Sequence, residues 1–160
     1  MNNKKFYNLI KKDKYQVFIF ICPGMIPFNF FSHPWFVINK KGILSRWELL
    51  FRKNRNKTSW NHLHKNFLPI FQGIEIFPFT HRYFWKSRLL GFIEGNKDST
   101  ARLIIKLIES SKKIYPYNNK YFLTGPNSNT YAQWILNNFP QFKVRLPSNC
   151  FGKDYIIKGK

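Results

Sequence analysis

The chain has 160 residues, about the length of one domain and long enough for one hydrophobic core. Hydrophobic residues make up 44% and aromatic residues 19%, which excludes a wholly disordered protein. The 27 Lys and Arg residues exceed the 7 Asp and Glu residues and give a net charge of +20. Such an excess attracts nucleic acids and anionic membranes. Lys is much the commoner cation, however, whereas Arg is preferred for bidentate recognition of phosphates and bases. Nucleic-acid binding is therefore the weaker expectation.

The cysteine count and the N-terminal pattern bear on the compartment. Cys22 and Cys150 are too few for a disulfide framework, and there is no CxxC metal site. The apolar run at 17–22 is too short for a signal peptide or a membrane-spanning helix. We expect a cytoplasmic protein with a basic N-terminal segment, 1–14, and a single α+β domain, 15–160. Association with an anionic membrane surface stays open.

The first half of the chain predicts strands. Residues 15–22 are rich in β-branched and aromatic side chains and end at Pro23-Gly24, as a buried strand would. Residues 30–38 and 43–51 flank the turn signal Asn39-Lys40-Lys41-Gly42 and predict a hairpin. Residues 52–69 have no clear period and predict an irregular segment.

The second half predicts two more strands and then two helices. Residues 70–79 and 83–92 are the candidate strands. Asp98 or Ser99 can cap a helix that runs to about Lys113. An apolar stripe predicts a second helix from Ser128 to about Asn138, which ends before Pro140. The expected fold is α+β, an antiparallel sheet of about five strands packed by two helices.

The hairpin places four candidate site residues on one face of the sheet. If the loop is Lys40-Lys41, Asn39 pairs with Gly42. Counting back along both strands from that pair places His33 opposite Glu48 and Trp35 opposite Arg46. A three-residue loop would instead bring Leu49 opposite His33.

A carboxylate beside an imidazole can hold one tautomer of a general base. The predicted register therefore makes Glu48 the orienting partner of His33. Asp154 is an alternative orienting residue if the chain returns to the sheet. A hydrogen-bonded structural histidine is the other interpretation of His33.

Five short motifs stand out along the chain: His-x-Trp at 33–35, Arg-Trp-Glu at 46–48, Tyr-Pro-Tyr at 115–117, Gly-Pro-Asn-Ser-Asn-Thr-Tyr at 125–131 and Gly-Lys-Asp-Tyr at 152–155. Together they resemble an uncharacterised bacterial family, a domain of unknown function, over most of residues 15–155. Leu123-Thr124 stands where that family usually has Trp-Pro, and Cys150-Phe151 replaces a pair of small aliphatic residues. The family has no established activity, so the resemblance implies no reaction.

A more distant resemblance is to permuted papain-like hydrolases and acyltransferases, which include NlpC-type peptidases and the lecithin:retinol acyltransferase group. These proteins carry a His on an early strand and a nucleophile at the start of a later helix. Ser128 stands at the cysteine position of the acyltransferase motif Asn-Cys-Glu-His-Phe. The resemblance implies that Ser128 is the nucleophile and His33 the base. Asn127 and Asn129 are then donors to the substrate or oxyanion, and Trp35 and Arg46 complete the binding site. A helix N-terminus would stabilise a developing oxyanion.

Other functions remain open at this point. Ser128 could simply cap its helix, because Ser and Asn are both good capping residues. A non-catalytic domain that binds a peptide or a lipid head group is the main alternative to an enzyme. A basic nucleic-acid or membrane-surface binder is the third. His62, His64 and His81 lack acidic or Cys partners at metal spacing and are expected in solvent. No metal and no cofactor is implied, and the oligomeric state is unknown.

Overall fold

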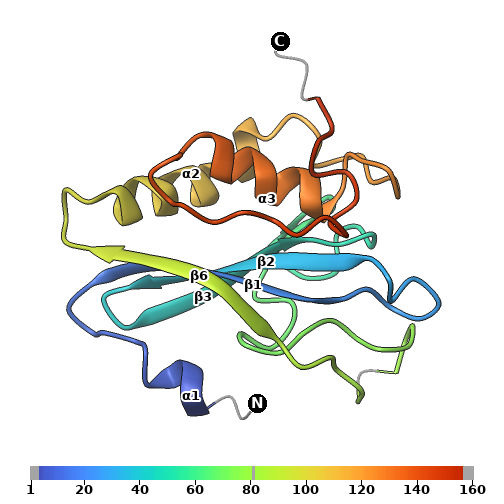
Figure 1. Ribbon diagram of the computed structural model, residues 1–160, viewed down its shortest axis with the longest axis horizontal. Helices are drawn as coiled ribbons and strands as arrows, with labels where there is room; N and C mark the ends of the chain where they lie inside the picture. The colour runs from blue at the N-terminus through green and yellow to red at the C-terminus, as the bar shows by residue number, and fades with distance from the viewer. Residues whose placement is uncertain (1–3, 81, 157–160) are drawn as a thin grey trace.

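The computed structural model describes residues 4–80 and 82–156, which form an α+β fold. A six-stranded antiparallel sheet carries two long helices on one face, and a short helix lies on the other side (Figure 1). The strands lie in the order β4-β5-β3-β2-β1-β6. The elements are α1 Lys4–Tyr7, β1 Tyr15–Pro23, β2 Ser32–Lys40, β3 Ile43–Leu49, β4 Ser59–Trp60, β5 Leu63–Lys65, β6 Arg88–Gly95, α2 Thr100–Ile114 and α3 Ser128–Asn137.

The predicted first strand, the hairpin and both helices are confirmed. β1 is buried along almost its whole length because it lies between β2 and β6, with side chains packed on both faces. Ser99 caps α2 by accepting a hydrogen bond from the backbone N–H of Arg102. α3 begins at Ser128, with Asn127 as its N-cap residue.

The predicted register of the hairpin is wrong by two residues. Lys40 pairs with Ile43, so the two-residue loop is Lys41-Gly42 rather than Lys40-Lys41. Both loop residues have positive φ, 53° and 92°, which is the conformation that a tight hairpin turn requires and that Gly adopts readily. Side chains alternate with a period of two, so this slip leaves every side chain on its predicted face.

The segment between the hairpin and α2 differs most from the prediction. The stretch expected to be irregular, 52–69, contains the short strands β4 and β5, which extend the sheet beyond β3. The strand expected at 70–79 is absent from its described residues apart from an isolated bridge between Glu75 and Phe84. Only the second half of 83–92 is a strand, as part of β6.

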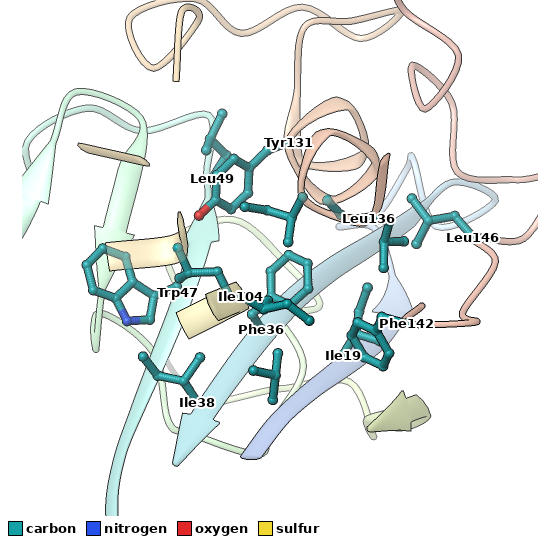
Figure 2. Packing of buried hydrophobic residues seen from close by; sticks show 14 of the residues in the cluster. Ile19, Phe36, Ile38, Trp47, Leu49, Ile104, Tyr131, Leu136, Phe142 and Leu146 are labelled. Carbon is teal, nitrogen blue, oxygen red and sulfur yellow. The ribbon is translucent and has the colours of Figure 1, made fainter. Parts of the chain in front are cut away.

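Two hydrophobic clusters cover the two faces of the sheet. The first lies between the sheet and the helices, where Tyr131 and Leu136 of α3 pack over Phe36 and Ile19 (Figure 2). The ring centroids of Phe36 and Tyr131 are 6.2 Å apart, in an edge-to-face arrangement. Phe36, Ile38, Trp47 and Leu49 all belong to this cluster, as the period-two pattern predicts.

The second cluster covers the opposite face. It includes Phe20, Trp35 and Val37 from the sheet and Phe71 from the long connection. Phe6 of α1 joins it, with its ring centroid 4.8 Å from that of Phe20. The segment before β1 therefore packs on the sheet through its one buried aromatic residue.

The sheet has two distinct ends, the cavity end and the far end. The cavity end is where β1 finishes at Pro23 and β2 begins at Ser32. The far end is where β1 begins at Tyr15, opposite Gly95 of β6. These are the right and left ends of the sheet in Figure 1. None of the helices within 4–80 and 82–156 is long and apolar enough to cross a membrane.

Candidate functional site

A cavity of about 340 Å³ lies at the cavity end of the sheet. Its polar lining includes His33 from β2 and Asn127, Ser128 and Asn129 from the start of α3. The remaining wall is mostly aromatic and aliphatic, with side chains from the β1–β2 loop, from the segment after β3 and from the C-terminal segment. The cavity therefore joins a few polar groups to a largely apolar space, which is typical of a small-molecule site.

β2 holds His33 near the end of the sheet, beside Glu48 of β3. The Nε2 atom of His33 lies 3.0 Å from Oε2 of Glu48. The observed pairing ends at Phe36 and Trp47, and its register continued by one position sets Glu48 opposite Trp35, so His33 reaches Glu48 as a diagonal neighbour on the same face. The structure thus brings these two residues together by a different register from the predicted one. It also places His33 on the opposite face of β2 from Phe36, the face away from α3.

The carboxylate of Glu48 is fixed by a buried arginine. Arg46 donates from Nη2 to Oε2 of Glu48 at 2.7 Å, and its Nε lies 2.6 Å from Oε1. Burial alone would raise the pKa of Glu48, but the Arg46 guanidinium and the His33 hydrogen bond outweigh burial and lower that pKa to about 2. Glu48 is therefore ionised and can only accept hydrogen bonds. When the ring of His33 is neutral, its Nε2 carries the proton and its Nδ1 keeps the free lone pair.

Trp35 and Arg46 lie behind the cavity and do not line it. The guanidinium of Arg46 stacks on the Trp35 ring, 4.4 Å from its centroid. Arg46 Nη1 donates to the carbonyl of Pro69, and Trp35 Nε1 donates to the carbonyl of Ile70 at 3.2 Å. The two residues predicted to bind substrate are thus engaged with the protein and support Glu48 from behind.

At the start of α3, the cap is Asn127 and not Ser128. Asn127 Oδ1 accepts from the backbone N–H groups of Asn129 at 2.9 Å and Thr130 at 3.2 Å. Thr130 Oγ1 accepts in turn from the Asn127 backbone N–H and completes a capping box. Ser128 is the first helical residue, and its buried hydroxyl has no capping role.

The side-chain amides of Asn127 and Asn129 hold the C-terminal segment against α3. Asn127 Nδ2 donates to the carbonyls of Phe122, Leu123 and Phe151, at 3.1, 2.9 and 3.0 Å. Asn129 Nδ2 also donates to Phe151, at 2.8 Å, which uses one of its two N–H groups. Of these two candidate donors to a substrate, Asn129 retains the more hydrogen-bonding capacity.

We expect Asn127→Ala to destabilise the protein by at least about 2 kcal/mol, because it removes a cap together with the side-chain amide that donates to three carbonyls. The matched control is Ser99→Ala, which removes the cap of α2 and one exposed hydrogen bond to the carbonyl of Asn96, and should cost about 1 kcal/mol. Urea unfolding of both variants measures the difference. Equal losses would show that the amide bonds of Asn127 add nothing to its capping role.

Tyr121 is a site residue that the sequence analysis did not single out. Its hydroxyl lies 3.5 Å from Ser128 Oγ, and its side chain lines the cavity. Burial raises the pKa of Tyr121, although hydrogen bonds from the hydroxyl and backbone N–H of Ser128 partly offset this effect. The phenol therefore stays protonated and can donate. Tyr121 is the last residue of the Tyr-Pro-Tyr-Asn-Asn-Lys-Tyr run at 115–121. This run is the sequence feature that could have pointed to Tyr121 as a site residue.

His64 of β5 and His62, which precedes that strand, are not in solvent, contrary to the prediction. His64 is fully buried and bonded on both ring nitrogens, to Ser59 Oγ and to the carbonyl of Arg52, each at 2.7 Å. His62 is also buried, with Nδ1 2.7 Å from the carbonyl of Leu50. The short strands around them were not predicted, so neither was their burial. His81 lies outside the described residues. Among residues 4–80 and 82–156, no three His, Cys, Asp or Glu side chains form a group that could hold a metal ion.

Two further groups are alternatives to these residues, Cys22 as the nucleophile and Asp154 as the partner of His33. Cys22 pairs with His33 across β1 and β2, but burial raises the pKa of its thiol to about 12, which disfavours a thiolate nucleophile. Asp154 lines a separate groove with residues of α3, whereas Glu48 makes the contact with His33. The polar array at the cavity is therefore His33, backed by Glu48 and Arg46, together with Ser128 and Tyr121.

Comparison with known proteins places the chain in a family but does not supply an activity. No curated protein and no solved structure matches the sequence. One family does match, over residues 15–155, and its description is "Protein of unknown function (DUF3750)". Because this match covers most of the chain and includes every residue of the cavity described above, the chain belongs to the DUF3750 family.

Proposed function

We propose that this protein is a hydrolase or acyltransferase that acts on an ester or amide, with Ser128 as nucleophile and His33 as general base. One observation carries the proposal. The buried hydroxyl of Ser128 does not cap its helix, and it lines the same cavity as a histidine that is held by an ionised carboxylate. A buried serine hydroxyl that is not used as a cap, in one cavity with such a histidine, is the combination that nucleophilic catalysis requires.

In the proposed reaction, Ser128 Oγ attacks the carbonyl carbon of the substrate while its proton passes to His33 Nδ1. The carbonyl oxygen gains the negative charge, and the Tyr121 hydroxyl, 3.5 Å from Ser128 Oγ, is a side-chain donor that could stabilise it. Return of the proton from His33 to the leaving group breaks the ester or amide bond and leaves an acyl-serine. Water completes a hydrolysis, and a second nucleophile completes an acyl transfer. Glu48 stabilises the protonated imidazole that forms between these steps.

The permuted papain-like arrangement is part of the proposal. The chain order supports it, since His33 on β2 precedes Ser128 at the first position of α3. His33 and Ser128 do not face each other directly, because His33 is on the sheet face away from α3. Substrate binding must therefore bring Ser128 Oγ within hydrogen-bond distance of His33 Nδ1, since catalytic hydrogen bonds often tighten only in the complex. A cytoplasmic location also stays a prediction, and the buried free thiols of Cys22 and Cys150 are compatible with it.

A fluorophosphonate probe, which labels activated serines, tests the assignment of the nucleophile. We expect covalent labelling of the wild-type protein at Ser128 and its loss in Ser128→Ala and His33→Gln. Ser32 lines the same cavity but does not lie at a helix N-terminus, so Ser32→Ala is the matched control and should keep its labelling. Absence of labelling in the folded wild-type protein, or labelling that survives in Ser128→Ala, would refute the nucleophile assignment.

The second candidate is a non-catalytic domain that binds its ligand in the same cavity. The resting hydrogen bonds favour it: the hydroxyl of Ser128 is 3.5 Å from Tyr121, and no hydrogen bond joins Ser128 to His33 in the described part of the chain. This alternative predicts ligand binding without probe labelling or turnover. The labelling experiment therefore separates the two candidates.

A further inference from the structure

The mouth of the cavity is surrounded by exposed apolar side chains. Phe28, Phe30, Phe51, Leu123 and Phe151 are each between 47% and 68% exposed, and they are called the apolar rim below. All except Phe30 line the cavity itself. Soluble surfaces rarely gather large exposed apolar side chains in this way unless the patch binds something.

Three of the five residues of the apolar rim form one aromatic cluster. Phe31 links three of its members, with ring centroids 6.3 Å from Phe28, 4.1 Å from Phe30 and 4.4 Å from Phe151. The loop between β1 and β2 carries Phe28 and Phe30, and this loop extends from the cavity end of the sheet (Figure 1). Aromatic residues on a projecting loop can insert into apolar surroundings outside the protein without disturbing the sheet.

The few acidic residues of the protein are kept away from the apolar rim. Glu48 and Glu75 are buried. Four more lie at the far end, where Asp13 precedes β1, Glu94 pairs with Gln16, Asp98 precedes α2 and Glu109 contacts Lys40. Asp154 is then the one exposed carboxylate in the C-terminal segment near the cavity.

Cations remain beside the apolar rim without this compensation. Lys53 is exposed two residues after Phe51, and Lys120 is exposed three residues before Leu123. Lys153 is directed elsewhere, since its Nζ donates to the carbonyl of Leu146 at 3.3 Å and it lines the separate groove with Asp154. The uneven distribution of acids therefore leaves Lys53 and Lys120 as a cationic border beside the apolar rim.

We propose that the apolar rim docks on an anionic lipid bilayer and that the cavity receives an acyl chain from that bilayer. An apolar centre inserts into the acyl boundary while flanking cations attract anionic head groups, which is the recognition pattern of interfacial proteins. A cavity that opens through the rim lets an acyl chain enter without crossing water. This inference deepens the proposed function and rests on it in one respect, because it names the substrate class as an acyl ester of a membrane lipid.

Vesicle flotation tests the docking surface without reference to activity. We expect the wild-type protein to bind vesicles of phosphatidylcholine and phosphatidylglycerol, and to bind pure phosphatidylcholine vesicles much more weakly. Added salt should weaken binding to the anionic vesicles, because it screens the cationic border. The double variant Phe28→Ser/Phe30→Ser should bind the anionic vesicles at least about tenfold more weakly.

The matched control uses an apolar residue at the far end. Ile43 is 75% exposed at the start of β3, next to the β2–β3 turn, and Ile43→Ser should leave vesicle binding unchanged. Absence of binding by the wild-type protein, or binding that is undiminished in the double variant, would overturn the docking surface. The second result would show that net charge alone drives association, because neither variant changes the charge.

A third variant separates this inference from the proposed function. Ser128→Ala keeps the apolar rim, so it should bind vesicles like the wild type. Vesicle binding without turnover of lipid esters would support the docking surface and refute the proposed enzymatic activity. Turnover of water-soluble esters without vesicle binding would support the activity and refute the docking surface.

Discussion

Replacing Glu48 by Ala is expected to destabilise the protein by about 3–5 kcal/mol, because it leaves the guanidinium of Arg46 buried without a counter-charge. Arg46 and Glu48 are both at least 99% buried, so water cannot take the place of the lost carboxylate. The His33 imidazole loses its partner at the same time. Urea unfolding followed by circular dichroism measures the loss.

A more exposed ion pair, between β2 and α2, is the control for this prediction. Lys40 Nζ lies 3.0 Å from Oε1 of Glu109, at the far end and in solvent. Glu109→Ala should cost less than about 1 kcal/mol. The double variant Arg46→Met/Glu48→Ala should recover much of the loss, because no unpaired charge remains. A similar small effect for both single carboxylate variants would contradict the assignment of a tightly coupled buried pair.

The same pair predicts how stability depends on pH. The pKa of Glu48 falls from 4.5 to about 2 on folding, so the unfolded chain binds the proton more readily. The stabilisation is therefore complete above pH 4.5 and is lost as the pH falls toward 2. Burial also lowers the pKa of His64, and its contribution is lost in the same direction below about pH 6.5. The Glu48→Ala variant should lack the acid step between pH 4.5 and 2.

Periodicity alone predicted which side chains share a face, but not which residues face one another. The alternation in β2 and β3 correctly separated His33 and Glu48 from Phe36 and Trp47. The register depended on a choice between two Lys residues in the turn. Gly42 takes positive φ most readily, and this moves the loop by one position at each end. The His33–Glu48 contact tolerated the error because neighbours across a sheet include the diagonal position.

The least predictable part is the long connection after β3. Its two short strands are held by side-chain hydrogen bonds, such as that of Thr58 Oγ1 to the carbonyl of Lys65 at 2.6 Å, and carry no apolar pattern. This connection also supplies the carbonyls of Pro69 and Gln72 that accept from Arg46. Sequence patterns report local preference, whereas these contacts depend on where the connection crosses the sheet. For the same reason the sequence could not decide whether Asn127 or Ser128 caps α3.

The largest expected effect on activity comes from the pair Ser128 and His33. If the protein is an enzyme, Ser128→Ala and His33→Ala should each lower kcat/KM toward acyl esters by at least about a thousandfold, and the double variant should be no worse. The reason is that a nucleophile without its base, or a base without its nucleophile, performs no part of the reaction. Steady-state kinetics on a panel of soluble and lipid esters measures all three variants.

Stability measurements keep this experiment interpretable. Ser128 does not cap α3, so Ser128→Ala should change the free energy of unfolding by less than about 1 kcal/mol, well below the loss expected for Asn127→Ala. His33→Ala removes a buried partner of Glu48 and is expected to be less stable. His33→Gln is the second variant, because its amide can donate to Glu48 but cannot accept the serine proton. Activity that persists in folded Ser128→Ala or His33→Gln would exclude the proposed pair. Activity losses that multiply in the double variant would show that the two residues act independently.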